Sequence, residues 1–435
     1  MGARPNIFLF VKDTARAKNL SAYGYERDTT PFLERCAAEG FRFENAIASS
    51  IWTYPSHVSM FTGMYPHEHE RISKHDKGEI FFDSFVEDLS ERGYDTIGIS
   101  SNGWVSHSFG LDGFFDDFDM KTDRKTYLFD EAPLLKEFEQ KEGQGIWDSR
   151  LDKYRDFFSR AFREKKPKSV LNGLYYVFEH KFLDKVQSED FWSDDGAEKV
   201  LQDLKQMDFD AEVPKFTFVN FIEPHSPYTP PTEFAKKFYD GDIDEQRELL
   251  DTTPSDYLGK EDEEKAEILR DFYDASLNYM DHMLEKIHDE IEENTDRDNV
   301  FIFVGDHGEM FNADGLWEHH GGFRREVVRV PLIVKGHEEG IEEGIFELKD
   351  MGDLVQAIVD GEEFDFGGEE AYSDYLGLDS HMFDEDEIPE GFNNPKTARV
   401  KADGLEVVSS LDKADGKLKE HLRALKMKKN RNNIG

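Results

Sequence analysis

The densest apolar runs in the chain are two segments far apart in the sequence, and both end in acids. Asn6–Lys12 is followed by Asp13, and Val300–Gly305 is followed by Asp306 and His307. Apolar and β-branched residues are too frequent in both runs for a strand with one solvated face, so we predict two buried strands of a parallel sheet. Because α/β folds place their chemistry at the carboxyl ends of such strands, the two acids and the histidine are candidate metal ligands.

Other strand and helix signals alternate along the chain. We predict strands at Thr96–Ser100 and Phe216–Phe221, and helices at Pro31–Gly40 and Phe81–Arg92. An acidic, helical stretch from Asp242 is expected to lead to a further helix at Tyr273–Ile291. Residues 119–205 contain no short strand runs and are rich in Lys, Asp, Phe and Tyr, so we interpret them as a helical insertion. Gly- and Glu-rich stretches at Gly336–Gly344 and Asp384–Glu387 look like exposed loops.

The last segment, residues 413–435, is basic and carries Leu418, Leu422 and Leu425 at helical spacing. We predict a helix that docks on the acidic body. A nucleic-acid arm is the alternative, but the rest of the molecule would repel a polyanion.

Thr53 lies at the expected start of another helix. Pro55 suits a first helical turn and Gly63 suits a helix end, which places Thr53 just before the helix N-terminus. Free N–H groups and the helix dipole favour an anion or a nascent alkoxide there. A hydroxyl held beside a divalent cation in that field is a candidate nucleophile, whereas an isolated Thr-x-Pro would usually be only a helix cap.

Charge and composition narrow the functional class. The chain has 435 residues and a net charge of −41, which disfavours nucleic acid or an anionic membrane as a partner. No signal peptide or membrane-spanning run is visible, and the single Cys36 cannot form an intramolecular disulfide, so we expect a soluble, cytoplasmic protein. Such acidity is typical of halophilic proteins, with an acidic mesophilic enzyme as the alternative.

Several motifs resemble the sulfatase family of the alkaline phosphatase superfamily. They occur in the family's order from residue 4 to about 335: Arg4–Tyr25, Thr29–Leu33, Ala38–Phe43, Pro55–His57, Glu223–Tyr228, Tyr273–Ser276 with Asp281, Asp306–Glu309 and Arg329–Leu332. The resemblance implies an α/β three-layer sandwich with a mainly parallel central sheet. It also implies a catalytic domain over residues 1–335 and a small antiparallel annex over 336–412, with strands near Thr397–Val400 and Leu405–Ser409.

The resemblance also implies a site with one divalent metal ion. Asp13, Thr53, Asp306 and His307 match four positions that the superfamily uses around such an ion. We expect Ca²⁺ or Mn²⁺, with Mg²⁺ or Zn²⁺ as alternatives, because the set mixes oxygen ligands with one imidazole. Thr14 departs from the family, since many arylsulfatases have a second metal-binding Asp there.

Lys12 is a second departure, because an apolar residue usually precedes Asp13. Its ammonium could contact a substrate oxyanion. Strand alternation instead places it on the side opposite to Asp13 and favours a structural role.

The largest departure is at the nucleophile. Formylglycine-dependent sulfatases have a Cys-x-Pro-Ser-Arg or Ser-x-Pro-Ser-Arg motif, and the matching stretch here is Thr53-Tyr-Pro-Ser-His57. Threonine cannot become formylglycine, so conventional sulfatase maturation is excluded. Threonine is the nucleophile of related phosphodiesterases, phosphonate hydrolases and phosphoglycerol transferases, which are the alternative functions on glycan or glycerol esters. Direct attack by a metal-bound hydroxide and an inactive, sulfatase-like binding protein also remain open.

The opposite side of the site is expected to bind the oxyanion and the leaving group. His225 and His320 match family positions that contact the transferred group, and either could be a general acid; whether His319 or His320 faces the site is left open. Asn102 follows a predicted strand and could donate to a developing oxyanion. His57 could orient Thr53 or only cap a turn. The expected substrate is a small-molecule or glycan sulfate or phosphate ester.

Overall fold

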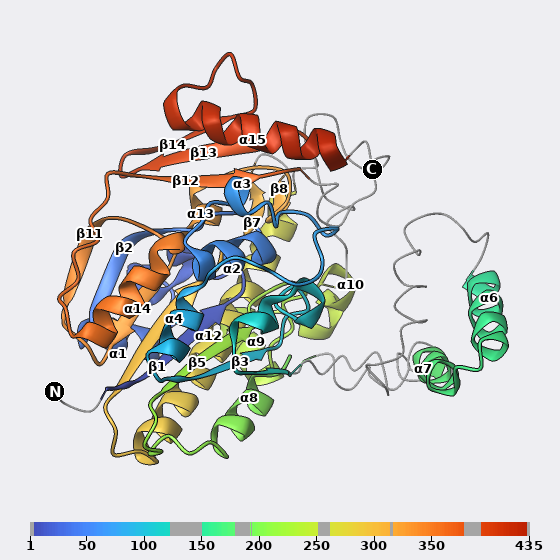
Figure 1. Ribbon diagram of the computed structural model, residues 1–435, viewed down its shortest axis with the longest axis horizontal. Helices are drawn as coiled ribbons and strands as arrows, with labels where there is room; N and C mark the ends of the chain where they lie inside the picture. The colour runs from blue at the N-terminus through green and yellow to red at the C-terminus, as the bar shows by residue number, and fades with distance from the viewer. Residues whose placement is uncertain are drawn as a thin grey trace. The chain divides into compact units, whose positions relative to one another are not determined.

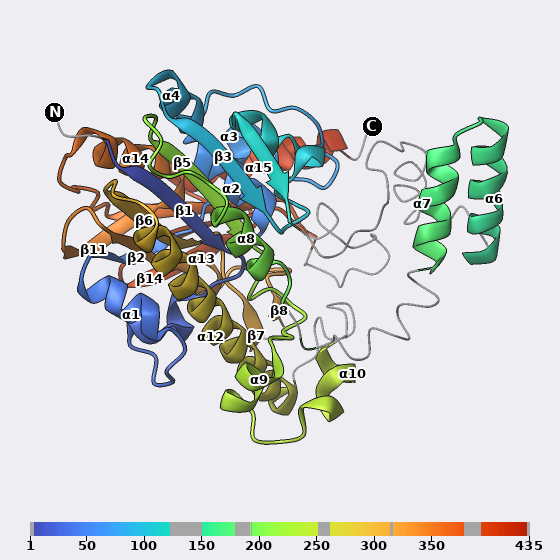
Figure 2. The ribbon, with the colours of Figure 1, turned by 90° about the horizontal axis from the view of Figure 1, so that it is seen from below.

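The computed structural model describes residues 4–121, 150–178, 192, 194–250, 262–313, 316–377 and 393–432. The chain divides into two compact units, one formed by Met1–Lys121 with Asp194–Gly435 and the other by Thr122–Ser193. The first unit contains a mixed, mostly parallel sheet between two layers of helices (Figures 1 and 2). The predicted α/β three-layer fold is therefore confirmed.

The nine-stranded main sheet has the order β11-β2-β10-β6-β1-β5-β3-β4, with β9 paired to β2. Its strands are β1 (Asn6–Lys12), β2 (Phe41–Ile47), β3 (Asp95–Ser100), β4 (Asp117–Met120), β5 (Lys215–Phe221), β6 (Asn299–Gly305), β9 (Arg329–Val330), β10 (Leu332–Lys335) and β11 (Gly340–Glu347). Strand β1 is parallel to both of its neighbours, β5 and β6. The four strands predicted from apolar runs are all present, each within one residue of its expected bounds.

Both faces of β1 are buried, which explains its continuous apolar run. Ile7, Leu9 and Val11 belong to the large core cluster that also contains the apolar side chains of α2, α4 and α14. The alternate residues Phe8 and Phe10 both stack on Phe301 of β6 on the other face. Helices α1 and α12 cover that second face (Figure 2).

The helices of the first unit have identifiable ends. They are α1 (Pro31–Ala38), α2 (Thr53–Thr62), α3 (Pro66–His69), α4 (Phe85–Glu91), α8 (Ala197–Leu204), α9 (Thr232–Phe238), α10 (Arg247–Leu250), α12 (Glu263–Glu293), α13 (Arg325–Val328), α14 (Met351–Asp360) and α15 (Gly416–Asn432). Helix α2 ends at Gly63, whose φ of 73° is the left-handed conformation that glycine adopts easily. Asp281 accepts the backbone N–H groups of Phe32 and Leu33 at the start of α1.

One expectation differs from the structure here. The helix predicted at Phe81–Arg92 begins only at Phe85, where Ser84 and Glu87 form a reciprocal cap. Helix α12 begins at Glu263, within the acidic stretch before Tyr273 that was also expected to be helical. None of the described helices is both long and apolar enough to span a bilayer.

Two small antiparallel sheets accompany the main one. One is formed by β12 (Glu370–Tyr375), β13 (Lys396–Lys401) and β14 (Gly404–Val408), and helix α15 packs against it (Figure 1). The other is the hairpin of β7 (Met310–Ala313) and β8 (Leu316–Glu318).

The interpretation of Gly336–Gly344 as an exposed loop is wrong from Gly340 onward. These residues begin β11, which pairs in parallel with β2 and buries Ile345 and Phe346 at the sheet edge. Strand β11 contains two glycines and the adjacent Glu342 and Glu343, and only its Ile345 and Phe346 are buried, so no apolar alternation indicated the strand in the sequence. Asp384–Glu387 lies outside the described residues.

The described residues of the second unit form the helices α6 (Arg150–Arg163) and α7 (Pro167–Phe178). Phe157 of α6 is buried, and its ring lies where a side chain at Gly173 of α7 would otherwise stand. The expected insertion of residues 119–205 was wider than this unit, since the end of β4 and helix α8 belong to the first unit.

Candidate active site

The parallel strands β1 and β6 bring the predicted metal ligands together. Lys12 and Gly305 are register partners, so the next residues, Asp13 and Asp306, leave the same edge of the sheet side by side. The Nε2 atom of His307 lies 3.5 Å from Asp13 Oδ1 and 3.6 Å from Asp306 Oδ2. All three side chains are fully buried. The strand-end residues therefore form one compact group of two carboxylates and one imidazole.

Thr53 joins this group from helix α2. Its Oγ1 atom lies 3.4 Å from Asp13 Oδ2 and 3.4 Å from His307 Nε2. The helix begins at Thr53 itself, after Trp52, rather than one residue later as predicted. Ser56 fixes this first turn over β6, because its hydroxyl donates to the Asp306 carbonyl at 2.7 Å. The hydroxyl of Thr53 is thus held among the acids, within the positive end of the helix dipole.

The loop after Asp13 is held in a strained conformation. Thr14 has a φ of 56°, which is unfavourable for a β-branched residue. Its N–H donates to Asp306 Oδ1 at 3.2 Å, and its carbonyl accepts a 2.8 Å hydrogen bond from the Tyr273 hydroxyl. Tyr273 also accepts the N–H of Arg16. These contacts stabilise the strained loop and fix the direction of the Asp13 side chain.

The acid group has the chemistry of a cation site. Asp13 Oδ1 and Asp306 Oδ2 are buried and have no hydrogen-bond partner among the described residues. The pKa of Asp13 lies well above its usual range because burial disfavours its charge and Asp306 repels it. Burial also raises the pKa of Asp306. A divalent ion would satisfy both orphaned oxygens and allow both carboxylates to ionise.

His307 is oriented as a metal ligand. Its Nδ1–H donates to the Gly308 carbonyl at 3.0 Å, which leaves the Nε2 lone pair directed at the acids. Burial lowers the pKa of His307 to about 3, so the ring is neutral at physiological pH. A neutral imidazole and two carboxylates suit Mn²⁺ or Zn²⁺, and carboxylates with a hydroxyl suit Ca²⁺ or Mg²⁺.

Asn102 contacts a candidate metal ligand from the end of β3. Its Nδ2–H donates to Asp13 Oδ2, and its Oδ1 accepts the Trp104 N–H at 2.8 Å. The side chain was predicted to bind a substrate oxyanion. In the structure its amide contacts a metal-ligand candidate.

His57 lies directly beneath Thr53 on α2. Its Nδ1–H donates to the Thr53 carbonyl at 2.9 Å, and its Nε2 lies 3.3 Å from the Asn220 amide nitrogen, which donates to it. Burial lowers the pKa of His57, so this fully buried ring is neutral. At the position where the family resemblance implies an arginine, this chain has a histidine that links helix α2 to β5.

A row of imidazoles continues from His307. The ring centroids of His307 and His319 are 4.5 Å apart, and those of His319 and His225 are 5.3 Å apart. His225 donates its Nδ1–H to the Ser226 carbonyl, which leaves its Nε2 for other contacts. His320 instead places its Nε2 3.1 Å from Glu318 Oε2. Of the two adjacent histidines, His319 is therefore the one packed against a metal-ligand candidate.

Lys12 lies apart from these residues. Burial lowers its pKa to about 8, and the charge of Asp281 on α12 opposes that shift. Cys36 of α1 is a further titratable neighbour, so Lys12 faces the α1 and α12 layer. This placement favours the structural alternative for Lys12 over contact with a substrate.

Two acids of this region were not assigned a role from the sequence. Glu309 is fully buried, and its Oε1 lies 3.5 Å from His319 Nδ1. Burial and the charge of Glu318 hold the pKa of Glu309 well above its usual range. The Asp306–Glu309 motif could have indicated Glu309 as a site residue. It was overlooked because Glu309 lies beyond the end of strand β6. Glu318 sits at the hairpin end with a φ of 53°, and nothing in its local sequence marks it.

A pocket of about 560 Å³ adjoins Glu309. Five cations contribute to its wall: Arg16, Lys18, Arg270, Arg324 and Arg329. Arg16 is 6% exposed, and its Nε atom is buried without a hydrogen-bond partner among the described residues. Its guanidinium stacks on Phe311. Three carboxylates, those of Glu26, Glu309 and Glu326, also line the pocket, so its wall carries more cations than acids although the chain has a net charge of −41.

Comparisons with known proteins agree with this geometry. The Sulfatase family profile matches residues 5–341. An arylsulfatase of Clostridium perfringens is 26% identical over 382 residues, which cover 80% of this chain and 73% of that protein.

Two solved structures share the fold over almost the whole chain. The phosphonate monoester hydrolase of Agrobacterium radiobacter has a TM-score of 0.60 at 17% identity, with 99% of this chain and 93% of that one covered. BT4656, solved in complex with its substrate D-glucosamine-2-N,6-O-disulfate, has a TM-score of 0.60 at 14% identity and 99% coverage of both chains. With the matched profile and the strand-end site, these findings show that the chain belongs to the Sulfatase family of ester hydrolases, within the alkaline phosphatase superfamily.

Proposed function

We propose that this protein is a metal-dependent hydrolase of phosphate or sulfate esters that uses the hydroxyl of Thr53 as its nucleophile and has no formylglycine. The observation that carries the proposal is the position of Thr53 Oγ1, 3.4 Å from both Asp13 Oδ2 and His307 Nε2 at the first turn of α2. A helix cap alone would not require two buried carboxylates and an imidazole beside it.

Asp13, Asp306 and His307 would hold the metal ion, and Thr53 would adjoin it. The ion supplies positive charge that favours ionisation of the hydroxyl and offsets the charge of the substrate's oxygens. Asn102 holds Asp13 by its amide, and His57 holds the backbone of Thr53. These residues position the nucleophile before the substrate arrives.

In the first step the bond from Thr53 Oγ1 to phosphorus or sulfur forms, and the bond to the leaving oxygen breaks. The hydroxyl proton passes to Asp13 Oδ2, and an imidazole of His225 or His319 gives its proton to the leaving oxygen. In the second step water attacks the Thr53 ester and returns a proton to the imidazole. The threonine oxygen leaves with the proton from Asp13, which restores the resting state.

The cationic pocket beside Glu309 supports an ester whose remaining part carries a negative charge. Glu309 lies between the pocket and His319, so the pocket adjoins the leaving-group side. Arg16 follows Asp13 by three residues on the loop held by Tyr273, so its position is coupled to that of the site. A phosphodiester, a phosphonate monoester or a glycan ester with a second anionic group fits this arrangement.

A substrate panel tests the proposal. Aryl sulfate, phosphate monoester, phosphodiester and phosphonate monoester are assayed with chelated protein reloaded with Mn²⁺, Ca²⁺, Mg²⁺ or Zn²⁺. We expect turnover of at least one ester that depends on added metal. Turnover that survives complete metal removal would contradict the assignment. The absence of turnover with every metal and ester would favour the binding-protein alternative.

A further inference from the structure

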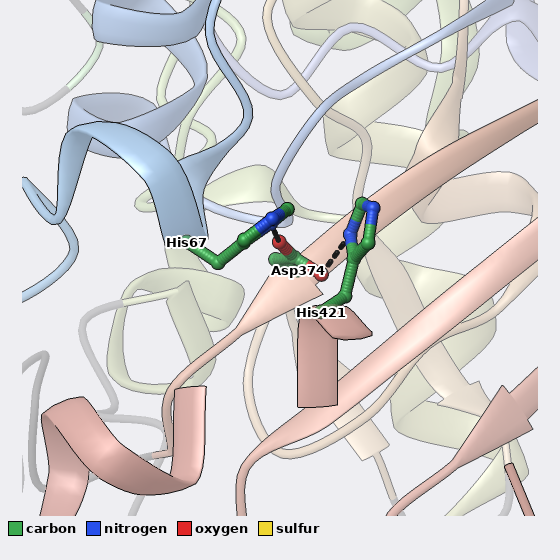
Figure 3. Close-up of side chains that lie close together, drawn as sticks. All are labelled: His67, Asp374 and His421. Atoms are coloured by element: carbon green, nitrogen blue, oxygen red, sulfur yellow. Dashed lines mark hydrogen bonds and ion pairs between the residues drawn. The ribbon is translucent and has the colours of Figure 1, made fainter. Parts of the chain in front are cut away.

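A second cluster of metal-ligand side chains is built from three other elements. His67 lies on α3, Asp374 on β12 and His421 on α15 (Figure 3). His67 Nδ1 lies 2.8 Å from Asp374 Oδ2, and His421 Nδ1 lies 3.1 Å from Asp374 Oδ1. One carboxylate therefore meets two imidazoles, each through the same ring nitrogen.

The cluster is buried and rigidly placed. The side chain of Asp374 is fully buried, and those of His421 and His67 are 3% and 9% exposed. The backbone of Asp374 is fixed on both sides, because its N–H donates to the Ser49 carbonyl at 2.9 Å and its carbonyl accepts from the Ser50 hydroxyl at 2.8 Å. The carboxylate thus has little freedom to move away from the rings.

The spacing of the donor atoms suits a small cation. One donor atom from each of the three residues lies within 4.8 Å of the others. Ligands on a tetrahedral zinc ion with bonds of 2.0–2.1 Å are separated by roughly 3.3 Å. The two nitrogen–oxygen distances, 2.8 and 3.1 Å, are close to this separation between ligands.

Electrostatics favour a cation over two protons. The ring centroids of His67 and His421 are only 3.9 Å apart, so two imidazolium ions would repel each other across one carboxylate. Two neutral imidazoles on one metal ion avoid this repulsion. The carboxylate of Asp374 meets both rings and supplies the negative charge that a divalent ion would offset.

We propose that His67, Asp374 and His421 bind a second divalent ion of the zinc class, which fastens α15 to α3 and β12. Two imidazoles and one carboxylate are a donor set that Zn²⁺ prefers, with water as the remaining ligand on the side of the less buried His67. The site is separate from the proposed catalytic ion and does not depend on the proposed function.

The ion would act as a structural clamp. Helix α15 is otherwise held by Leu418, Leu422 and Leu425 and by ion pairs such as Lys428 with Asp76 at 2.7 Å. The backbone of Asp374 is hydrogen-bonded to Ser49 and Ser50, which precede Thr53 by only a few residues. The clamp therefore also anchors the segment that leads to the nucleophile's helix.

The test uses Asp306→Ala, which disables the proposed catalytic ion site. The protein is treated with a chelator, reloaded with Zn²⁺ and passed through a desalting column in excess Mg²⁺, and retained zinc is measured by mass spectrometry. We expect about one zinc ion per chain, and none after His421→Gln is added. Zn²⁺ should raise the melting temperature of Asp306→Ala but not that of Asp306→Ala/His421→Gln.

His107→Gln in the Asp306→Ala background is the matched control. His107 also faces a carboxylate at 2.8 Å, that of Asp112, but its side chain is 58% exposed. This control should keep the zinc. If Asp306→Ala does not fold, His67→Gln in the wild-type chain should lower retained zinc by about one ion. Two results would overturn the proposal. One is that Asp306→Ala retains no zinc, as expected for a cluster held by protons only. The other is that Asp306→Ala and Asp306→Ala/His421→Gln retain equal amounts of zinc.

Discussion

Asn102→Ala should weaken metal binding without unfolding the protein. The variant removes the amide that donates to Asp13 Oδ2, while its other contact, the Trp104 N–H, lies in the same loop. A hydrogen bond to a charged group contributes about 1.5–3 kcal/mol. Tenfold in affinity corresponds to about 1.4 kcal/mol, so the expected loss is roughly 10- to 100-fold, which is also the usual effect of removing a residue that orients a metal ligand.

The assay is a metal titration of chelator-treated protein by calorimetry, with turnover measured at each metal concentration. Turnover of Asn102→Ala should recover when metal saturates the site, because Asp13, Asp306 and His307 remain. Asn6→Ala is the matched control: Asn6 is also buried, at the other end of β1, where its amide donates to Phe209 and Asn299. Metal affinity of Asn102→Ala within twofold of the control would refute the reasoning.

Three further predictions concern the ligands, the surface charge and a buried histidine. Asp306→Ala should lose the catalytic ion and all turnover while circular dichroism stays native, and retained turnover would remove Asp306 from the site. Lowering salt from about 1 M to about 0.01 M should lower the melting temperature, since the Debye length grows from about 3 to 30 Å around a chain of net charge −41; an unchanged melting temperature would count against a halophilic origin. Burial lowers the pKa of His69 to about 3. The unfolded chain, with a His pKa of about 6.5, therefore binds more protons than the folded chain below that pH. Acidification to pH 5 should lower the free energy of unfolding of the wild-type protein by about 2 kcal/mol more than that of His69→Gln. Equal pH dependence of the two proteins in denaturant titrations would contradict this.

The strand-end part of the site could be predicted from the sequence because two local patterns determine it. A doubly buried strand shows as a continuous apolar run, and parallel neighbours place the residues that follow them at one edge. Asp13, Asp306 and His307 needed no other information. Thr53 was found because Pro55 and Gly63 mark the ends of its helix.

The rest of the site depends on packing that local patterns do not encode. Whether His319 or His320 packs against His307 depends on how the β7–β8 hairpin is placed. A hairpin this short has no hydrophobic periodicity that would indicate its placement from the sequence. The cluster of His67, Asp374 and His421 joins three elements that are distant in sequence, so none of its members stood out. Strand β11 was missed because its glycines and the adjacent Glu342 and Glu343 resemble a loop.

The central claim is that Thr53 forms a covalent ester during turnover. Rapid quenching of the wild-type protein with a phosphodiester or phosphonate substrate, followed by peptide mass spectrometry, measures this directly. We predict a phosphoryl or phosphonyl adduct on the peptide that contains Thr53, no adduct and no turnover for Thr53→Ala, and partial turnover for Thr53→Ser. Near-native turnover of Thr53→Ala would contradict the account and identify water as the attacking group, with Thr53 reduced to the first residue of helix α2.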